Sequence, residues 1–270
     1  SSHLFKNVIL NAYPVSLKIS EFPHQFNTVL GLMTVDISPA IKPFLVNDAT
    51  FIIFATFSFA EIAEVYTWEA SPGKNQEMIA NMTRAAEIHR SQGAQVSINV
   101  HDVGSTQLVD YVIRWDDMAS YAETKDAQMT SVEWQEFWSD VSSNPVGTLT
   151  TSFSAANLDQ TKMASDFNGS YVYSVSVWDN VETGKVQQLL ENFQTAKAII
   201  EESGARVEIY AGGHGSRGQY HFVLLYDSWS SLTDSFMKLG QSQDWMSFMQ
   251  ETSSENIADE IRYFTGYTVN

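Results

Sequence analysis

The sequence contains no cysteine, and it has few basic residues for its length. Its 270 residues include 15 Lys and Arg against 32 Asp and Glu, which gives a net charge of −17. Without thiols, the chain forms no disulfide, thiolate zinc site, iron–sulfur cluster or cysteine nucleophile. The acidic excess would repel nucleic acids and anionic membranes, so neither is predicted as a partner. A hydrophobic content of 44% indicates a globular protein.

Charged residues are distributed unevenly along the chain. Residues 1–60 carry no net charge, contain no tryptophan and hold four of the six prolines. The net charge is −10 over residues 61–160 and −7 over residues 161–270. We therefore predict an extended or strand-like N-terminal arm over residues 1–60, followed by two acidic domains with those bounds.

The sequence also lacks a long apolar run. The run Phe51–Ala60 is much shorter than the roughly 20 residues of a membrane-spanning helix. It lies too deep in the chain and has no basic flank, so it does not resemble a signal peptide. We expect a soluble protein in which this run is a buried strand, and the sequence leaves its compartment open.

An internal repeat relates the two acidic domains. When the chain is shifted by 111 residues, Gly93 falls on Gly204 and Trp134 falls on Trp245, and further glycine, aromatic and acidic positions coincide with them. A single offset that persists over most of a domain indicates a tandem duplication.

Each repeat is predicted to follow the order β-α-β-β-α-β. Apolar residues at helical spacing predict a helix over residues 185–202, and Gly204 follows where glycine commonly ends a helix. Asp116 and Asp227 are predicted to cap the second helix of each repeat. The predicted strands cover residues 61–68, 95–101, 108–115 and 146–153, and then 171–178, 206–210, 219–226 and 259–267. This order predicts an α+β fold of two tandem ferredoxin-like units.

The repeats resemble the dimeric α+β barrel superfamily and, within it, tandem NIPSNAP-like domains. The resemblance covers residues 61–270. It rests on a first strand ending in tryptophan, a helix closing on Gly-Ala, a glycine-turned hairpin ending in an aromatic residue and aspartate, and a Ser-x-x-Trp segment. It implies that two units pair into one barrel, within one chain or between two chains. It also implies a functional class, because the superfamily includes cofactor-free monooxygenases, isomerases and lyases acting on hydrophobic or aromatic compounds.

Strand alternation predicts which side chains enter such a barrel. In the second and third strands of each repeat, the apolar positions are assigned to the helices and the opposite positions to the interior. In the first strand, the even-numbered set with Glu64 is assigned to the interior. The predicted interior groups are Glu64, Tyr66, Asn99, His101, Asp110 and Arg114, with Glu208, Tyr210 and His221 from the second repeat. Because unpaired buried polar groups are costly, these groups predict a ligand pocket or, alternatively, a wet barrel or internal pairs such as Asp110–Arg114.

Several of these groups suit acid–base chemistry. His221 and His101 are the candidate general bases, since neutral imidazole is available near pH 7. Arg114 is the candidate catalytic group that would hold an enolate or carboxylate oxygen. The predicted ligand-binding residues are Glu64, Tyr66, Asn99, Asp110, Glu208, Tyr210 and His214. His214 lies in the glycine-rich stretch 212–218, which is predicted to be a flexible hairpin turn or, alternatively, a mobile loop over the pocket mouth.

Three functions remain open from the sequence. The first is a small-molecule-binding barrel, as a cofactor-free enzyme or a binding protein, with a hydrophobic or aromatic ligand. The second is a haem protein of the chlorite dismutase-like branch, for which the resemblance offers His221 or His214 as axial ligand. The third is a non-catalytic interaction or assembly protein, a homo-oligomer with residues 1–60 at an interface. Haem apart, no cofactor is predicted, and no histidine pair has the spacing of a zinc site.

Overall fold

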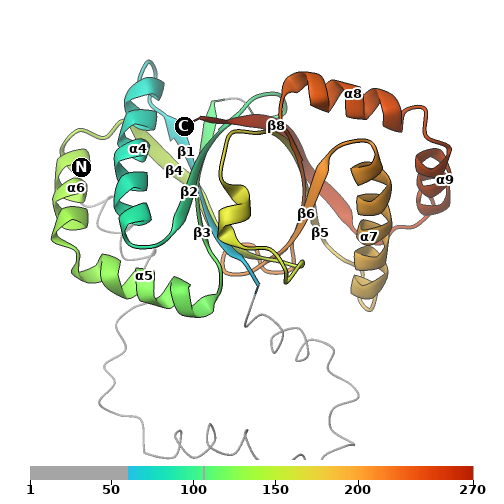
Figure 1. Cartoon of the computed structure of the whole chain (residues 1–270), viewed down its shortest axis with the longest axis horizontal. Coiled ribbons are helices and arrows are strands. Elements are labelled where there is room, and N and C mark those ends of the chain that lie inside the picture. The colour runs from blue at the N-terminus through green and yellow to red at the C-terminus, as the bar shows by residue number, and fades with distance from the viewer. Residues whose placement is uncertain (1–59, 106, 270) are drawn as a thin grey trace, which may run out of the picture. The chain divides into compact units, whose positions relative to one another are not determined.

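The computed structural model describes residues 60–105 and 107–269 (Figure 1). The predicted arm, with the strand predicted over residues 51–60, lies outside the described residues except for Ala60. The first half contains β1 (Ile62–Ala70), α4 (Asn75–Ser91), β2 (Gln95–His101), β3 (Leu108–Trp115), α5 (Met118–Thr130), α6 (Val132–Ser143) and β4 (Gly147–Asn157). A short 3-10 helix, η4 (Ala164–Phe167), lies in the link to the second half. The second half contains β5 (Val172–Asp179), α7 (Val186–Glu202), β6 (Arg206–Gly212), β7 (Tyr220–Tyr226), α8 (Trp229–Leu239), α9 (Gln243–Thr252) and β8 (Asp259–Val269).

The second helix of each half begins one residue later than predicted. Asp117 caps α5, and its Oδ1 accepts a hydrogen bond of 2.8 Å from the backbone N–H of Ser120. Ser228 caps α8 in the same way by accepting from Ser231. Asp116 and Asp227 therefore do not cap these helices, because the residue after each has the extended backbone that an N-cap needs.

The eight strands form one closed antiparallel barrel, in the order β1-β3-β2-β8-β5-β7-β6-β4. Each half contributes four neighbouring strands. The halves join where β2 pairs with β8, as at Val100 and Tyr267, and where β4 pairs with β6, as at Ala156 and Ala211. The barrel thus closes within a single chain, one of the two arrangements that the resemblance implies.

Each β-hairpin folds onto the last strand of the other half. The backbone N–H of Asp102 donates to the carbonyl of Thr265 at 2.8 Å, and the backbone N–H of Gly213 donates to the carbonyl of Ser154 at 2.7 Å. The two bonds are equivalent, because Asp102 and Gly213 are 111 residues apart, and so are Ser154 and Thr265. Gly215 has a φ of +80°, and a Cβ atom there would lie 2.5 Å from the carbonyl oxygen of Ser152. The glycine-rich turn is therefore packed against β4, and it needs glycine to approach that closely.

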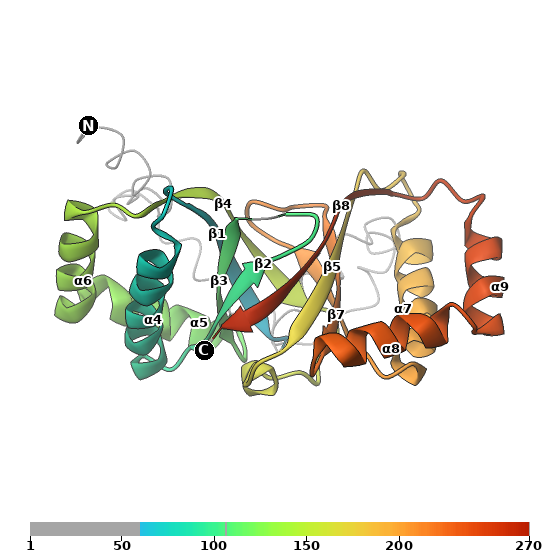
Figure 2. The ribbon, with the colours of Figure 1, turned by 90° about the horizontal axis from the view of Figure 1, so that it is seen from above.

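Side chains pack in three separate clusters. The helices cover the outside of the barrel, with α4, α5 and α6 on one side and α7, α8 and α9 on the other (Figure 2). One apolar cluster, which includes Trp115, lies under the helices of the first half, and another, which includes Phe193, lies under those of the second. The third cluster fills much of the barrel interior and includes Val112, Tyr173 and Phe264. An eight-stranded barrel is just wide enough for such filling.

Candidate functional site inside the barrel

The interior retains a cavity of about 90 Å³. Asp110 and Arg114 of β3 line it together with His221 of β7, as do Asn99 and Tyr210. Strand alternation therefore placed these five side chains correctly. The apolar part of the lining comes from alternate residues of several strands: Ala63, Val65, Val112, Phe153, Ala155, Val175, Val177, Val223, Leu225 and Phe264.

Asp110 lies toward the end of the barrel where the two hairpins are, which we call the hairpin end. Its Oδ1 accepts a hydrogen bond of 2.6 Å from the Thr67 hydroxyl. Its Oδ2 lies 2.7 Å from Nε2 of His101. The His101 ring is stacked on Phe264, with ring centroids 4.3 Å apart, and it does not line the cavity. His101 thus fixes the Asp110 carboxylate from behind, and Asp110 is the member of the pair that faces the cavity.

His221 lines the opposite wall. In the barrel order, β7 is separated from β3 by three strands in either direction, so His221 faces Asp110 across the interior. Burial, followed by the positive charge of Arg262, lowers the pKa of His221 to about 4, while Asp110 acts in the opposite direction. The ring is therefore neutral at pH 7 and is stacked on Phe153 at 4.8 Å. Its Nε2 is buried and has no hydrogen-bond partner in the described part of the chain.

Arg114 lies toward the other end of the barrel, where β1 begins and the link with η4 lies; we call this the link end. Its Nε is 3.2 Å from the carboxylate of Glu61, and its Nη1 donates to Ser97 at 3.0 Å. Burial raises the pKa of the fully buried Glu61, and the charge of Arg114 opposes that shift. The predicted Asp110–Arg114 pair is therefore replaced by Arg114–Glu61 and Asp110–His101. Glu61 was not predicted as an interior residue, because the even-numbered residues of the first strand were assigned to the interior.

Glu208 and Tyr210 of β6 also lie on the inner face. The carboxylate of Glu208 accepts from Asn157 at 3.0 Å and from Arg206 at 2.6 Å. Burial, and then the negative charge of Glu61, raises the pKa of Tyr210 well above its ordinary value, so its hydroxyl stays protonated. Glu208 is fully buried by these partners, whereas Tyr210 reaches the cavity.

Glu64 and Tyr66 do not face the interior, and their predicted placement is wrong. Glu64 accepts from Tyr66 at 2.8 Å and from Tyr121 at 3.0 Å, and it pairs with Lys125 at 2.5 Å. Tyr121 and Lys125 belong to α5, on the helix side of the sheet. A shift of one residue in strand phase exchanges the two faces, and β1 turns its odd-numbered residues inward.

His214 is not part of the cavity either. It is exposed in the β6–β7 turn, where its backbone N–H donates to the Ser154 hydroxyl at 2.9 Å. The prediction that it contributes to a pocket mouth receives no support from this position. The glycine-rich sequence around His214 has no strand alternation from which the direction of its side chain could be predicted.

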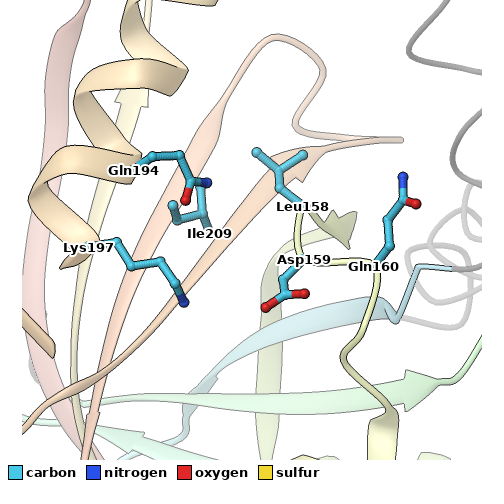
Figure 3. Close-up of a pocket in the computed structure, with 6 residues that line it drawn as sticks. All are labelled: Leu158, Asp159, Gln160, Gln194, Lys197 and Ile209. Atoms are coloured by element: carbon cyan, nitrogen blue, oxygen red, sulfur yellow. The ribbon is translucent and has the colours of Figure 1, made fainter.

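A larger pocket of about 260 Å³ lies outside the barrel, between the link and α7 (Figure 3). Leu158, Asp159, Gln160, Gln194, Lys197 and Ile209 line it. Lys197 is paired with Glu201 at 3.0 Å and also donates to the carbonyl of Val207. The pocket holds none of the predicted site residues, and its only cation is already paired. The barrel interior is therefore the stronger candidate site.

The haem alternative does not fit these residues. His214 is exposed, and His221 faces a cavity of about 90 Å³, well below the roughly 300–1,000 Å³ of pockets for drug-sized ligands.

Within residues 60–105 and 107–269, no three His, Asp or Glu side chains are grouped so that they could hold a metal ion. No helix among the described residues is long and apolar enough to cross a membrane.

Comparison with known proteins confirms the resemblance drawn from the sequence. Residues 63–148, in the first half, match the NIPSNAP family model. No curated protein matches the chain. Candidate monooxygenases of known structure from Fusobacterium nucleatum and Lactobacillus acidophilus are similar in fold, with TM-scores of 0.54 and 0.52 at 11% and 8% identity. Both alignments cover 78% of this chain, and they cover 94% and 93% of the respective relatives.

An anthrone oxidase-like protein of known structure is similar to the same degree. Its TM-score is 0.51 at 12% identity, and the alignment covers 80% of this chain and 93% of that protein. At such low identities, these likenesses establish the fold, a mixed α and β structure of the dimeric α+β barrel type with an antiparallel sheet.

Proposed function

We propose that the barrel binds a small polar molecule between Asp110 and His221, and that it is a cofactor-free enzyme in which Asp110 exchanges a proton with the ligand and His221 hydrogen-bonds it. One observation carries the proposal: a buried nitrogen without a partner, Nε2 of His221, lines a cavity whose opposite wall holds a carboxylate. A buried polar atom without a partner is costly, and a ligand or water in the cavity would remove that cost.

The size of the cavity limits the ligand. An engineered protein cavity of about 150 Å³ binds benzene, and about 90 Å³ holds less than that. The hydrophobic or aromatic ligand expected from the resemblance therefore does not fit the cavity as it stands. A carbonyl or carboxylate compound smaller than benzene does fit.

The lining gives each group a role in such a reaction. Asp110 can take up a proton from the carbon next to the ligand carbonyl and return it, while neutral His221 hydrogen-bonds the carbonyl oxygen. His101 and Thr67 hold both oxygens of Asp110 and so fix its direction. Arg114, beside Tyr210, is placed to stabilise negative charge on a ligand oxygen. This set suits an isomerase or lyase that removes a proton next to a carbonyl.

Two tandem ferredoxin-like domains, residues 61–160 and 161–270, are part of the same proposal. The two halves repeat one order of elements, and their hairpins make equivalent hydrogen bonds. Divergence after duplication would account for Asp110 and His221, which occupy positions 111 residues apart. The homo-oligomer with residues 1–60 at an interface remains a prediction from the sequence.

Titration with pyruvate, followed through the ring-proton NMR signals of the histidines, tests the proposal. We expect the His221 signal to move on addition of pyruvate and the His214 signal to stay in place. Asp110→Asn should weaken the effect, whereas Glu64→Gln, a matched acidic site on the helix side, should leave it intact. If acetone and pyruvate both leave His221 unchanged, the cavity does not bind small carbonyl compounds.

A further inference from the structure

The ring of Phe167 contacts two arginine side chains at the link end. The guanidinium carbons of Arg114 and Arg206 are each 4.5 Å from its centroid. Phe167 belongs to η4, outside the strands, yet it is buried in the interior cluster. A segment that joins the two halves therefore supplies a side chain to the core of the barrel.

Both arginines are held in place independently of Phe167. Arg114 pairs with Glu61 at 3.2 Å, and Arg206 pairs with Glu208 at 2.6 Å. Both carboxylates are fully buried. Removal of the Phe167 ring would thus leave a slot that two fixed guanidinium groups border.

The segment that carries Phe167 is held by contacts outside the strand pairs, among them the ion pair of Lys162 with Glu208 at 3.5 Å. The N–H of Ala164 donates to Asp116 at 2.7 Å, and the carbonyl of Asp166 accepts from Arg206 at 2.6 Å. Residues 165, 166 and 168–170 are exposed, and no atom lies within 4 Å of where a Cβ of Gly169 would be. Phe167 can therefore leave the slot without breaking a strand pair.

We propose that the slot between Arg114 and Arg206 is a binding site for a planar aromatic molecule, which takes the place of Phe167. Guanidinium groups attract the faces of aromatic rings, and two fixed guanidiniums favour a flat ring over a saturated one. The slot is at the link end and does not require Asp110 or His221, although it shares Arg114 with the proposed reaction.

Phe167→Ala opens the slot and tests the proposal directly. Calorimetry should show that benzoate binds this variant about fivefold more tightly than cyclohexanecarboxylate, the ratio that corresponds to about 1 kcal/mol of cation–π attraction. Adding Arg206→Met should bring the two affinities together. A folded Phe167→Ala protein that binds neither compound, or binds both equally, overturns the proposal.

The unmodified protein offers a second measurement if Phe167→Ala does not fold. Lys162 lies in the link, so displacement of Phe167 should make trypsin cleave there faster. Benzoate should accelerate this cleavage, and cyclohexanecarboxylate should do so less; no acceleration by benzoate counts against the site. Asp110→Asn should leave the response to benzoate unchanged, which separates this site from the carbonyl site.

Discussion

His101 and Asp110 are joined by a hydrogen bond of 2.7 Å inside the barrel, and only Asp110 reaches the cavity. The two residues are on neighbouring strands, β2 and β3, at the hairpin end. Because Thr67 holds the other carboxylate oxygen, the direction of Asp110 is fixed before any ligand arrives. This arrangement makes His101 a positioning residue, although its sequence context suggested a general base.

Replacement of His101 by phenylalanine tests the positioning role. The new ring can still stack on Phe264, while Asp110 loses one donor. We expect the free energy of unfolding to fall by about 1–3 kcal/mol, measured by urea denaturation, and pyruvate binding to weaken. His214→Phe, in the exposed turn, is the control. Equal losses in both variants would show that the Asp110 contact contributes nothing specific.

Stability should fall between pH 6.5 and pH 4 because of two buried histidines. Burial is the main cause that lowers the pKa of both His221 and His89 to about 4, with Arg262 adding for His221 and Lys125 for His89. In the unfolded chain these histidines bind protons below about pH 6.5. Their contribution to the free energy of unfolding is therefore complete above that pH and is lost as the pH falls toward 4. Each histidine accounts for at most about 3 kcal/mol.

Urea denaturation at a series of pH values measures this effect. His221→Phe should flatten the slope between pH 6.5 and 4, and so should replacement of His89, which Tyr111 and Gln128 hold by hydrogen bonds. His214→Gln should leave the slope unchanged. A slope that is the same in all three variants would rule out this origin.

Substitutions of Glu61 and Arg114 should have non-additive effects on the free energy of unfolding. Arg114→Met leaves the fully buried Glu61 carboxylate without its cation, which should cost about 3–5 kcal/mol. The double variant with Glu61→Gln removes that buried charge and should recover part of the loss. Thermal and urea unfolding of both single variants and the double variant measure the coupling. Strict additivity would mean that the two groups do not stabilise each other.

Alanine substitution should destabilise the protein more at the glycines of the two hairpins than at a glycine elsewhere that also has a positive φ. In Gly104→Ala and Gly215→Ala the new Cβ would lie 2.5 Å from a backbone oxygen of the other half. Gly73→Ala has a similar φ of +77° and no atom within 4 Å, so it bears only the conformational cost of about 1–2 kcal/mol. We expect clearly larger losses of unfolding free energy at the hairpins. Similar losses at all three sites would show that the hairpins accommodate the new Cβ atoms without further loss of stability.

The sequence by itself determined the order of the strands and the inner face of β3 and β7; the structure adds a helix before the last strand of each half, α6 and α9. On β2 and β3, polar groups such as Asn99 and Asp110 alternate with strongly apolar residues, and a period of two fixes the face. The same alternation placed His221 and Tyr210 on the inner face.

Only the tertiary structure decided the face of β1 and the partners of the buried charges. In β1, the odd-numbered set with Ala63 and Val65 and the even-numbered set with Ile62 and Tyr66 are both apolar, so the pattern sets no phase. The contact of Glu64 with Lys125 on α5 settles it. Arg114 pairs with Glu61 because the start of β1 lies beside the end of β3 in the barrel. Pairing across strands depends on which strands become neighbours, and alternation within one strand carries no information about that.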